Sequence, residues 1–262
     1  MNDNPKISII TIAYNNASDI EPTLKSVSGQ TYENIEYIVV DGASTDGTLA
    51  IIDRYRDSIN VFISEPDEGM YDAINKGIKR ATGDVVGLIH AGDRLHDSRV
   101  IETVSSAFRD GNVDAIYGYS RLVDSHNRCR TVNISPSFSK LWIRLGWMPS
   151  HQSIYVRRSF FEQRGYYRND LGGSGDYEWF LRFFFFNTLR VKRLRAFLIR
   201  FSLGGRSTRS LLVKLSSQKV HRQCWIDNGA SPPPLLVPCK LLRGAFQRSI
   251  GLLCQSNLIF RE

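Results

Sequence analysis

Two aspartates follow short apolar segments in the first part of this 262-residue chain and are the first candidates for chemistry. Asp41 directly follows residues 36–40, and Asp93 comes shortly after residues 85–89. An aspartate at the end of a strand can accept hydrogen bonds from a ribose or a base, or bind a Mg²⁺ or Mn²⁺ ion that bridges phosphate oxygens. The structural alternatives are a polar turn at Asp41 and a helix cap at Asp93, and these segments alone leave both open.

A second acidic patch lies far along the chain, in a region that is otherwise poor in acid. Asp176 and Glu178 follow the glycine-rich residues 172–175. A carboxylate near a reacting hydroxyl can act as a general base. Alternatively, Asp176 caps a helix and Glu178 pairs with Arg182 four residues later. The two interpretations are compatible.

Three further polar residues are candidates for the same chemistry. His90 is either a second metal ligand or a polar residue at the edge of a sheet. His151 and Gln152 either line a pocket for a second reactant or form a satisfied polar pair at the start of a strand. The chain has neither a GxGxxG nor a GxxxxGK[ST] motif, which argues against a dinucleotide fingerprint and a P-loop. Its four cysteines form no CxxC pair, so we expect no zinc site and no disulfide framework.

The elements that must position these residues alternate between strand and helix. Because β-branched runs alternate with helical segments at this spacing, we expect βαβ units and a mainly parallel sheet flanked by helices. A capping box of Ser18 and Glu21 is expected to start the first helix, and Gly83 to end the third. The expected strands are residues 6–12, 36–40, 61–64, 85–89, 115–119 and 152–156. The first expected helix ends at about residue 30, and the others cover residues 49–57, 71–82, 178–186 and 235–260.

Charge is distributed unevenly along the chain. Residues 1–138 hold 13 Lys/Arg and 20 Asp/Glu, whereas residues 139–262 hold 21 and 6. The basic residues of 195–201 alternate with Phe and Leu, a pattern that can attract anionic lipid headgroups at about 1 kcal/mol per basic side chain. The alternative is a solvated basic face over a buried apolar one. Nucleic acid is a disfavoured partner, because the acidic half would repel its phosphates. We expect no spanning helix and no secretory signal.

Several segments, in this order, resemble those of family 2 glycosyltransferases with a GT-A fold, over roughly residues 5–210. The later segments are similar to those of the bacterial exopolysaccharide branch, which includes colanic acid biosynthesis transferases. The segments are residues 9–15, 39–48, 64–77 and 90–93, extended by 150–153, 174–177 and 201–208.

The resemblance implies roles for individual residues. Asp93 would meet Mg²⁺ or Mn²⁺ and the diphosphate of a nucleotide sugar, and Asp176 matches the position of the catalytic base, with Glu178 as the second choice. Many relatives have Asp-x-Asp where this chain has His90-Ala91-Gly92-Asp93, so glycine replaces the middle acid of the metal motif. The remaining implied roles are nucleoside binding by Thr11, Tyr14 and Asp41, the donor side for Asp72, Asn75 and Lys76, and the acceptor side for His151 and Gln152.

The expected protein is therefore an α/β enzyme of GT-A type. We expect a donor half at 5–98, an acceptor half at 99–210 and a basic helical extension at 211–262. The resemblance implies inverting transfer of a sugar from a nucleotide-diphosphate sugar. Together with the basic C-terminal region and the cysteine pattern, it leads us to expect a lipid-linked polysaccharide acceptor in the cytoplasm, at the inner face of the plasma membrane. The alternatives are a non-catalytic, degenerate transferase that contacts membrane surfaces, and a sugar nucleotidyltransferase.

Overall fold

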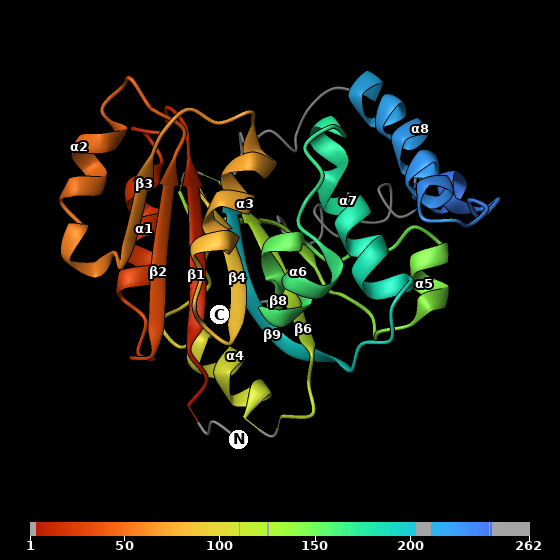
Figure 1. Ribbon diagram of the computed structural model, residues 1–262, viewed down its shortest axis with the longest axis horizontal. Coiled ribbons are helices and arrows are strands. Elements are labelled where there is room, and N and C mark those ends of the chain that lie inside the picture. Colours follow the sequence, from red (N-terminus) through yellow and green to blue (C-terminus); the bar gives the residue numbers. More distant parts are fainter. Residues whose placement is uncertain (1–3, 110, 125, 203–210, 241, 243–262) are drawn as a thin grey trace.

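The computed structural model describes residues 4–109, 111–124, 126–202, 211–240 and 242, except for the side chains of 211–216. Most of the expected helix over 235–260 and residues 203–208 of the last matching segment lie outside these ranges. Within them, nine strands form one sheet, in the order β3-β2-β1-β4-β8-β6-β9-β5, with β7 paired to β6 (Figure 1). No helix in the described part of the chain combines the length and the apolar character needed to cross a membrane.

The first four strands are parallel and end at one edge of the sheet. They are β1 (Ile7–Ala13), β2 (Ile35–Asp41), β3 (Val61–Ser64) and β4 (Val85–His90). Their register pairs Ala13 with Asp41 and Asp41 with Ser64, while Ile12 pairs with His90. β1 is buried along its whole length, as expected for a parallel strand covered on both faces. The four predicted strands are confirmed, and the loops that follow them meet at the same edge.

The second half of the sheet is mixed: β1–β4 are parallel, and beyond them β6 and β9 form the one parallel pair among the described strands. β8 is antiparallel to β4 and β6, and β9 is parallel to β6 but antiparallel to β5. β9 includes residues 195–201, which are therefore part of the sheet. These strands are β5 (Arg94–Leu95), β6 (Ala115–Val123), β7 (Cys129–Asn133), β8 (Ile154–Arg157) and β9 (Val191–Ser202).

Helices cover both faces of the sheet, with a separate apolar core under each layer. On one face lie α1 (Ile20–Ser28), α2 (Thr48–Asp53) and α4 (Val100–Phe108). On the other lie α3 (Met70–Arg80), α5 (Lys140–Arg144), α6 (Ser159–Arg164), α7 (Gly175–Phe180) and α8 (Leu211–Asp227). Helices α7 and α8 pack side by side at the right of Figure 1.

Some predicted helix ends differ from those in the structure. α1 has Asp19 at its N-cap, and Ser18 donates to the Asp19 carboxylate, so the expected capping box does not form. α3 ends at Arg80 rather than at Gly83. A Cβ at Gly83 would lie 2.7 Å from the carbonyl oxygen of Lys6, so this glycine allows close packing against the first strand. The expected helix at 178–186 is α7 followed by a π-helical turn over Leu181–Phe185.

A buried carboxylate, that of Glu36, joins β1 and β2 near their N-terminal ends. Glu36 accepts hydrogen bonds from Ser8 Oγ at 2.6 Å, from the Thr82 backbone N–H at 2.7 Å and from Lys6 Nζ at 3.0 Å. Burial raises the pKa of the Glu36 carboxyl, but these hydrogen bonds outweigh it and lower the pKa to about 2. Glu36 therefore stabilises the sheet as an ionised group.

Candidate active site

The loops after β1 and β2 are fastened to each other by hydrogen bonds. The Asn15 backbone N–H donates to Ser44 Oγ at 2.8 Å, and the Asn15 side-chain oxygen accepts from the Thr45 N–H at 2.9 Å. The Asn16 N–H donates to Thr48 Oγ1 at 2.8 Å. Asn15 has a φ of 49°, a left-handed conformation that asparagine tolerates better than most residues. The two loops therefore form one structured rim above the ends of the strands.

Two of the residues expected to bind a nucleoside lie beneath this rim. Asp41 is fully buried, and its carboxylate accepts hydrogen bonds from the Ser44 N–H and from Ser64 Oγ, both at 2.9 Å. Thr11 is also fully buried and lies 3.0 Å from the Tyr37 hydroxyl. Both side chains thus have partners within the protein, and their contact with a nucleoside stays a prediction.

The exposed part of this edge is formed by Tyr14 and by a residue that we did not predict. Tyr14 is 53% exposed. A Cβ at Gly42 would lie 3.3 Å from Tyr14 Cδ2 and 3.1 Å from Asp67 Cγ, so both side chains lie beside this glycine. Asp67 is held by the Gly69 N–H, which donates to its carboxylate at 2.8 Å. Its signal in the sequence was its place just after the third strand, at the edge where Asp41 and Asp93 also lie.

Two of the predicted donor-side residues, Asp72 and Lys76, shape the loop before α3. Lys76 Nζ donates to the Pro66 carbonyl at 2.7 Å, and it pairs with Glu65 at 3.0 Å and with Asp72 at 3.1 Å. The Asp72 carboxylate also accepts from the Glu68 N–H at 3.2 Å. These contacts hold the segment that carries Asp67.

Asn75, the third predicted donor-side residue, connects α3 to the second half of the chain. Its side-chain NH₂ donates to the Tyr167 carbonyl at 2.8 Å, and its side-chain oxygen accepts from the Tyr167 N–H at 2.9 Å. Asn75 is buried, so these hydrogen bonds have little competition from water. In this structure its amide therefore fastens the two halves of the chain together.

Asp93 lies in the turn after β4, where two donors hold its carboxylate. Gln152 Nε2 donates at 2.8 Å and the Ser202 backbone N–H at 3.1 Å. Burial raises the pKa of Asp93 to about 6, against the lowering effect of these hydrogen bonds and of the nearby Arg94 charge. Among the described residues, no three His, Cys, Asp or Glu side chains are grouped so that they could hold a metal ion by themselves.

Asp176 lies near the start of α7, in contact with side chains from both halves of the chain. Its carboxylate accepts from the Tyr71 hydroxyl at 3.3 Å, and that hydroxyl accepts from the Asp176 N–H at 3.0 Å. His151 Nδ1 lies 3.7 Å from the carboxylate, and His151 Nε2 lies 2.6 Å from His90 Nε2. The Asp176 side chain is 24% exposed, so it remains accessible. His90 and His151 thus lie together beside the predicted base.

Gly175 makes the close approach of α3 and α7 possible. A Cβ at this position would lie 2.7 Å from Tyr71 Cε2 and 2.8 Å from the Arg168 carbonyl oxygen. Any larger residue would push Tyr71 or the backbone aside. The glycine before Asp176 is therefore required by packing.

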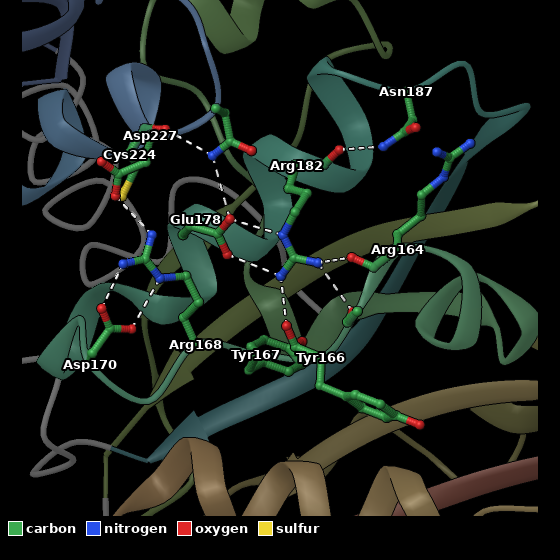
Figure 2. A network of polar contacts seen from close by, with 12 residues as sticks. Arg164, Tyr166, Tyr167, Arg168, Asp170, Glu178, Arg182, Asn187, Cys224 and Asp227 are labelled. Atoms are coloured by element: carbon green, nitrogen blue, oxygen red, sulfur yellow. Dashed lines mark hydrogen bonds and ion pairs between the residues drawn. The ribbon is translucent and has the colours of Figure 1, made fainter.

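Glu178 has a different environment from that of Asp176. Both of its carboxylate oxygens accept hydrogen bonds from Arg182, at 2.9 and 3.1 Å, which confirms the predicted pairing four residues apart. Figure 2 shows that the same guanidinium also donates to backbone carbonyls, including that of Tyr166 at 2.6 Å. The Glu178 side chain is only 3% exposed. Glu178 thus forms a buried ion pair that holds α7 to the segment before it.

Comparisons with known proteins identify the family and the fold of this chain. Residues 8–190 match the sequence model of Glycosyl transferase family 2. An uncharacterized glycosyltransferase of Mycobacterium tuberculosis is 32% identical over 186 residues, 70% of each chain. Glycosyltransferase AglE of Haloferax volcanii is 27% identical over 187 residues, which are 67% of this chain and 60% of AglE.

Two solved structures share the fold at low sequence identity. S. aureus TarS 1-349 in complex with UDP-GlcNAc is 19% identical with a TM-score of 0.70, over 94% of this chain and 75% of that one. The mannosyltransferase PcManGT of Pyrobaculum calidifontis, in complex with GDP-Man and Mn²⁺, is 18% identical with a TM-score of 0.63, over 97% and 74%. The chain therefore belongs to glycosyltransferase family 2 and has the GT-A fold.

Proposed function

We propose that this glycosyltransferase moves a sugar from a nucleotide-diphosphate donor to a hydroxyl of a lipid-linked polysaccharide, with inversion at the anomeric carbon. In this proposal residues 5–98 bind the donor and residues 99–210 bind the acceptor. The relatives support a sugar donor, because TarS was solved with UDP-GlcNAc and PcManGT with GDP-Man.

The observation that carries the proposal is the arrangement around two adjacent residues. Gln152 donates to the Asp93 carboxylate, and His151 lies beside the Asp176 carboxylate. A single short segment therefore holds both the candidate group for the diphosphate and the candidate base. Inverting transfer by direct displacement needs these two groups, one to stabilise the leaving group and one to take the proton of the attacking hydroxyl.

Asp176 is the base in this mechanism. Its carboxylate takes the proton from the acceptor hydroxyl as that oxygen attacks the anomeric carbon and the bond to the diphosphate breaks. The Tyr71 hydroxyl orients the carboxylate from one side. Burial raises the pKa of Tyr71 well above its usual value, and the Asp176 charge raises it further, so Tyr71 stays a hydrogen-bond donor. His151 lies at the other side and helps to fix the position of the base.

Asp93 fits a limited role in binding a divalent cation. It contributes one carboxylate, at the edge of the sheet where phosphates would lie, and Gly92 replaces the additional acid of the Asp-x-Asp motif. When bound, such an ion would neutralise charge on the leaving diphosphate. Gln152 would then orient Asp93 toward the ion.

The nucleoside site of the proposal lies on the rim after β1 and β2. Tyr14 offers an exposed ring, and Asp67 offers a carboxylate beside Gly42, where the lack of a side chain leaves room for both of these side chains. Thr11 and Asp41 support this rim from below. Among the donor-side residues, Asp72 and Lys76 set the shape of the loop, and Asn75 holds it to the acceptor half.

The acceptor and its location are the least direct parts of the proposal. Residues 139–262 hold 21 Lys/Arg and 6 Asp/Glu, an excess of 15 positive charges. This excess favours a peripheral contact with an anionic membrane at its cytoplasmic face. A lipid-linked acceptor would be presented there. Salt-dependent pelleting with anionic vesicles, compared with neutral vesicles, tests this contact.

The experiment that tests the proposed reaction is a donor screen with purified full-length protein. Thermal shift is measured with UDP-, GDP- and dTDP-sugars, with and without Mg²⁺ or Mn²⁺, because a ligand of the folded state raises apparent stability. Donors that bind are then tested for hydrolysis and transfer. If no nucleotide sugar binds or reacts, the proposed function is wrong and a degenerate, non-catalytic role is favoured. If pyrophosphate is released from a nucleoside triphosphate, the protein is a nucleotidyltransferase.

A further inference from the structure

His90, at the end of β4, is fixed by two contacts to a pair of neighbouring residues. Its backbone N–H donates to Gln152 Oε1 at 2.9 Å, and its ring nitrogen Nε2 lies 2.6 Å from His151 Nε2. The two imidazole rings pack with their centroids 4.9 Å apart, tilted by 40°. The other nitrogen of the His151 ring is the one that faces Asp176. His90 can therefore act on Asp176 through His151.

The two oxygens of the Asp176 carboxylate have different surroundings. Oδ1 accepts a hydrogen bond from the Tyr177 backbone N–H at 2.7 Å and another from the Tyr71 hydroxyl at 3.3 Å. Oδ2 faces His151, whose Nδ1 lies 3.7 Å away, slightly beyond hydrogen-bond distance. Because Oδ1 already accepts from two donors, Oδ2 is the oxygen better placed to take a proton. Whether His151 Nδ1 carries a hydrogen then decides what this oxygen meets.

The short distance between the two rings restricts the tautomer of His151. Two Nε2 atoms can lie 2.6 Å apart only if one carries a hydrogen and the other accepts it. Burial lowers the pKa of His151, against the raising effect of the Asp176 charge, so the ring is neutral and carries a single N–H. With that hydrogen on Nε2, a bare lone pair on Nδ1 would face the carboxylate and repel it. With the hydrogen on Nδ1, the N–H faces Oδ2, and Nε2 accepts from His90. Only the second arrangement is favourable at both ends of the ring.

We propose that His90 is a positioning residue for sugar transfer. By donating to His151 Nε2, it fixes the Nδ1–H tautomer of His151, and this N–H holds Oδ2 of Asp176 in place for the acceptor hydroxyl. The inference rests on the proposed role of Asp176 as base. A hydrogen bond to the far nitrogen of a histidine sets both its tautomer and its ring orientation. When the substrates are bound, we expect the 3.7 Å contact to shorten to a hydrogen bond.

The first test is the ¹⁵N NMR spectrum of the full-length protein labelled at histidine, because protonated and unprotonated imidazole nitrogens resonate far apart. His151→Asn identifies the signals of His151 by their loss. In the wild type, we expect Nδ1 of His151 to be protonated and Nε2 to be unprotonated, the opposite of the tautomer that imidazole prefers in water. In His90→Phe, which keeps a ring but removes the donor, the Nε2–H form should increase.

The second test is turnover with the nucleotide sugar found in the donor screen. His90→Phe should lower kcat about tenfold or more, while nucleoside diphosphate affinity stays close to that of the wild type. His90→Gln should restore most of the turnover, because its side-chain NH₂ can donate to His151 Nε2 although it has no ring. If the two rings only pack on each other, the order is reversed, with His90→Phe active and His90→Gln impaired. His126→Phe is the control, because it removes an exposed imidazole from the turn between β6 and β7 and should turn over normally.

The outcomes separate this inference from the proposed function. If no nucleotide sugar reacts with the wild type, the proposed function fails, and this inference fails with it. If transfer occurs but His151 carries its hydrogen on Nε2, or if His90→Phe turns over normally, the positioning role of His90 is refuted and the proposed function stands. Thermal unfolding shows whether each variant is folded. The wild-type spectrum tests the tautomer without any substitution.

Discussion

Replacing each of the two acids of α7 by its amide should separate a catalytic carboxylate from a structural one. Glu178→Gln removes the charge that pairs with Arg182, whereas Asp176→Asn removes the accessible charge beside His151. We expect the first change to lower stability and the second to stop sugar transfer. The two variants differ by one atom each from the natural side chain, so packing is nearly unchanged.

The expected magnitudes follow from burial. The Glu178 side chain is 3% exposed and the Arg182 side chain 19%. Breaking a buried ion pair costs about 3–5 kcal/mol, and the partial exposure of the arginine favours the lower end, about 3 kcal/mol. For a chain of this size, that corresponds to a fall of about 6–12 °C in Tm. Asp176, at 24% exposure, should change stability by less than about 1 kcal/mol, while loss of a general base should slow transfer about 10²–10⁴-fold.

The assay combines thermal unfolding followed by circular dichroism with transfer rates measured under saturating donor. Glu162→Gln is the matched control, because Glu162 of α6 forms a similar pair with Arg158, the N-cap residue of that helix, but the Glu162 side chain is 56% exposed. That variant should shift Tm by no more than a few degrees. The reasoning is refuted if Glu178→Gln abolishes transfer at unchanged Tm while Asp176→Asn turns over normally. Glu178 would then be the base despite its ion pair.

Three other predictions follow from the same geometry. Gln152→Leu removes the amide that orients Asp93, so the Mn²⁺ concentration for half-maximal activity should rise about tenfold or more; an unchanged metal titration would contradict this role. Gly175→Ala should cost about 1–3 kcal/mol by overpacking and lower kcat by displacing Asp176, as measured by denaturant unfolding and transfer rates. The pKa of Glu36 is lowered from 4.5 to about 2, so its contribution to stability is complete above pH 4.5 and is lost as the pH falls toward 2. Denaturant unfolding should lose about 2 kcal/mol over this interval, allowing for solvent screening, and Glu36→Gln should lack this part of the pH dependence.

The strands β1–β4 could be predicted because their signal is local. Short runs of β-branched residues, bounded by polar turns, indicate buried parallel strands, and the positions of Asp41 and Asp93 at one edge follow from parallel pairing. β9 had no such signal. Basic residues interrupt its apolar ones, and exposed positions such as Lys192 and Arg195 alternate irregularly with half-buried ones. Its place in the sheet depends on pairing with β6, about 75 residues earlier, which no local pattern encodes.

Which residues belong to the candidate site was easier to predict than which groups their side chains contact. The sequence identifies Asn75 and Gln152 as polar residues near expected ligands, but their amides bind the Tyr167 backbone and Asp93, respectively. These partners lie 92 and 59 residues away along the chain. The space beside Asp176 is a similar case, because Gln218 and His221 of α8 line it and α8 packs on α7. Such contacts depend on tertiary packing.

These long-range contacts also constrain how the enzyme can work. Asp176 is held by Tyr71 from α3, and Asn75 fastens α3 to the segment around Tyr167 in the second half of the chain. The position of the proposed base is therefore set by the helix that carries the proposed donor-side residues, and in this proposal the two substrates would meet across contacts that are already made within the protein. Since the same residues align the halves and border the ligands, a loss of turnover on substituting them does not by itself identify a ligand contact. Donor affinity, acceptor affinity and turnover must each be measured, because a residue that only aligns the halves changes kcat while nucleoside diphosphate affinity is retained.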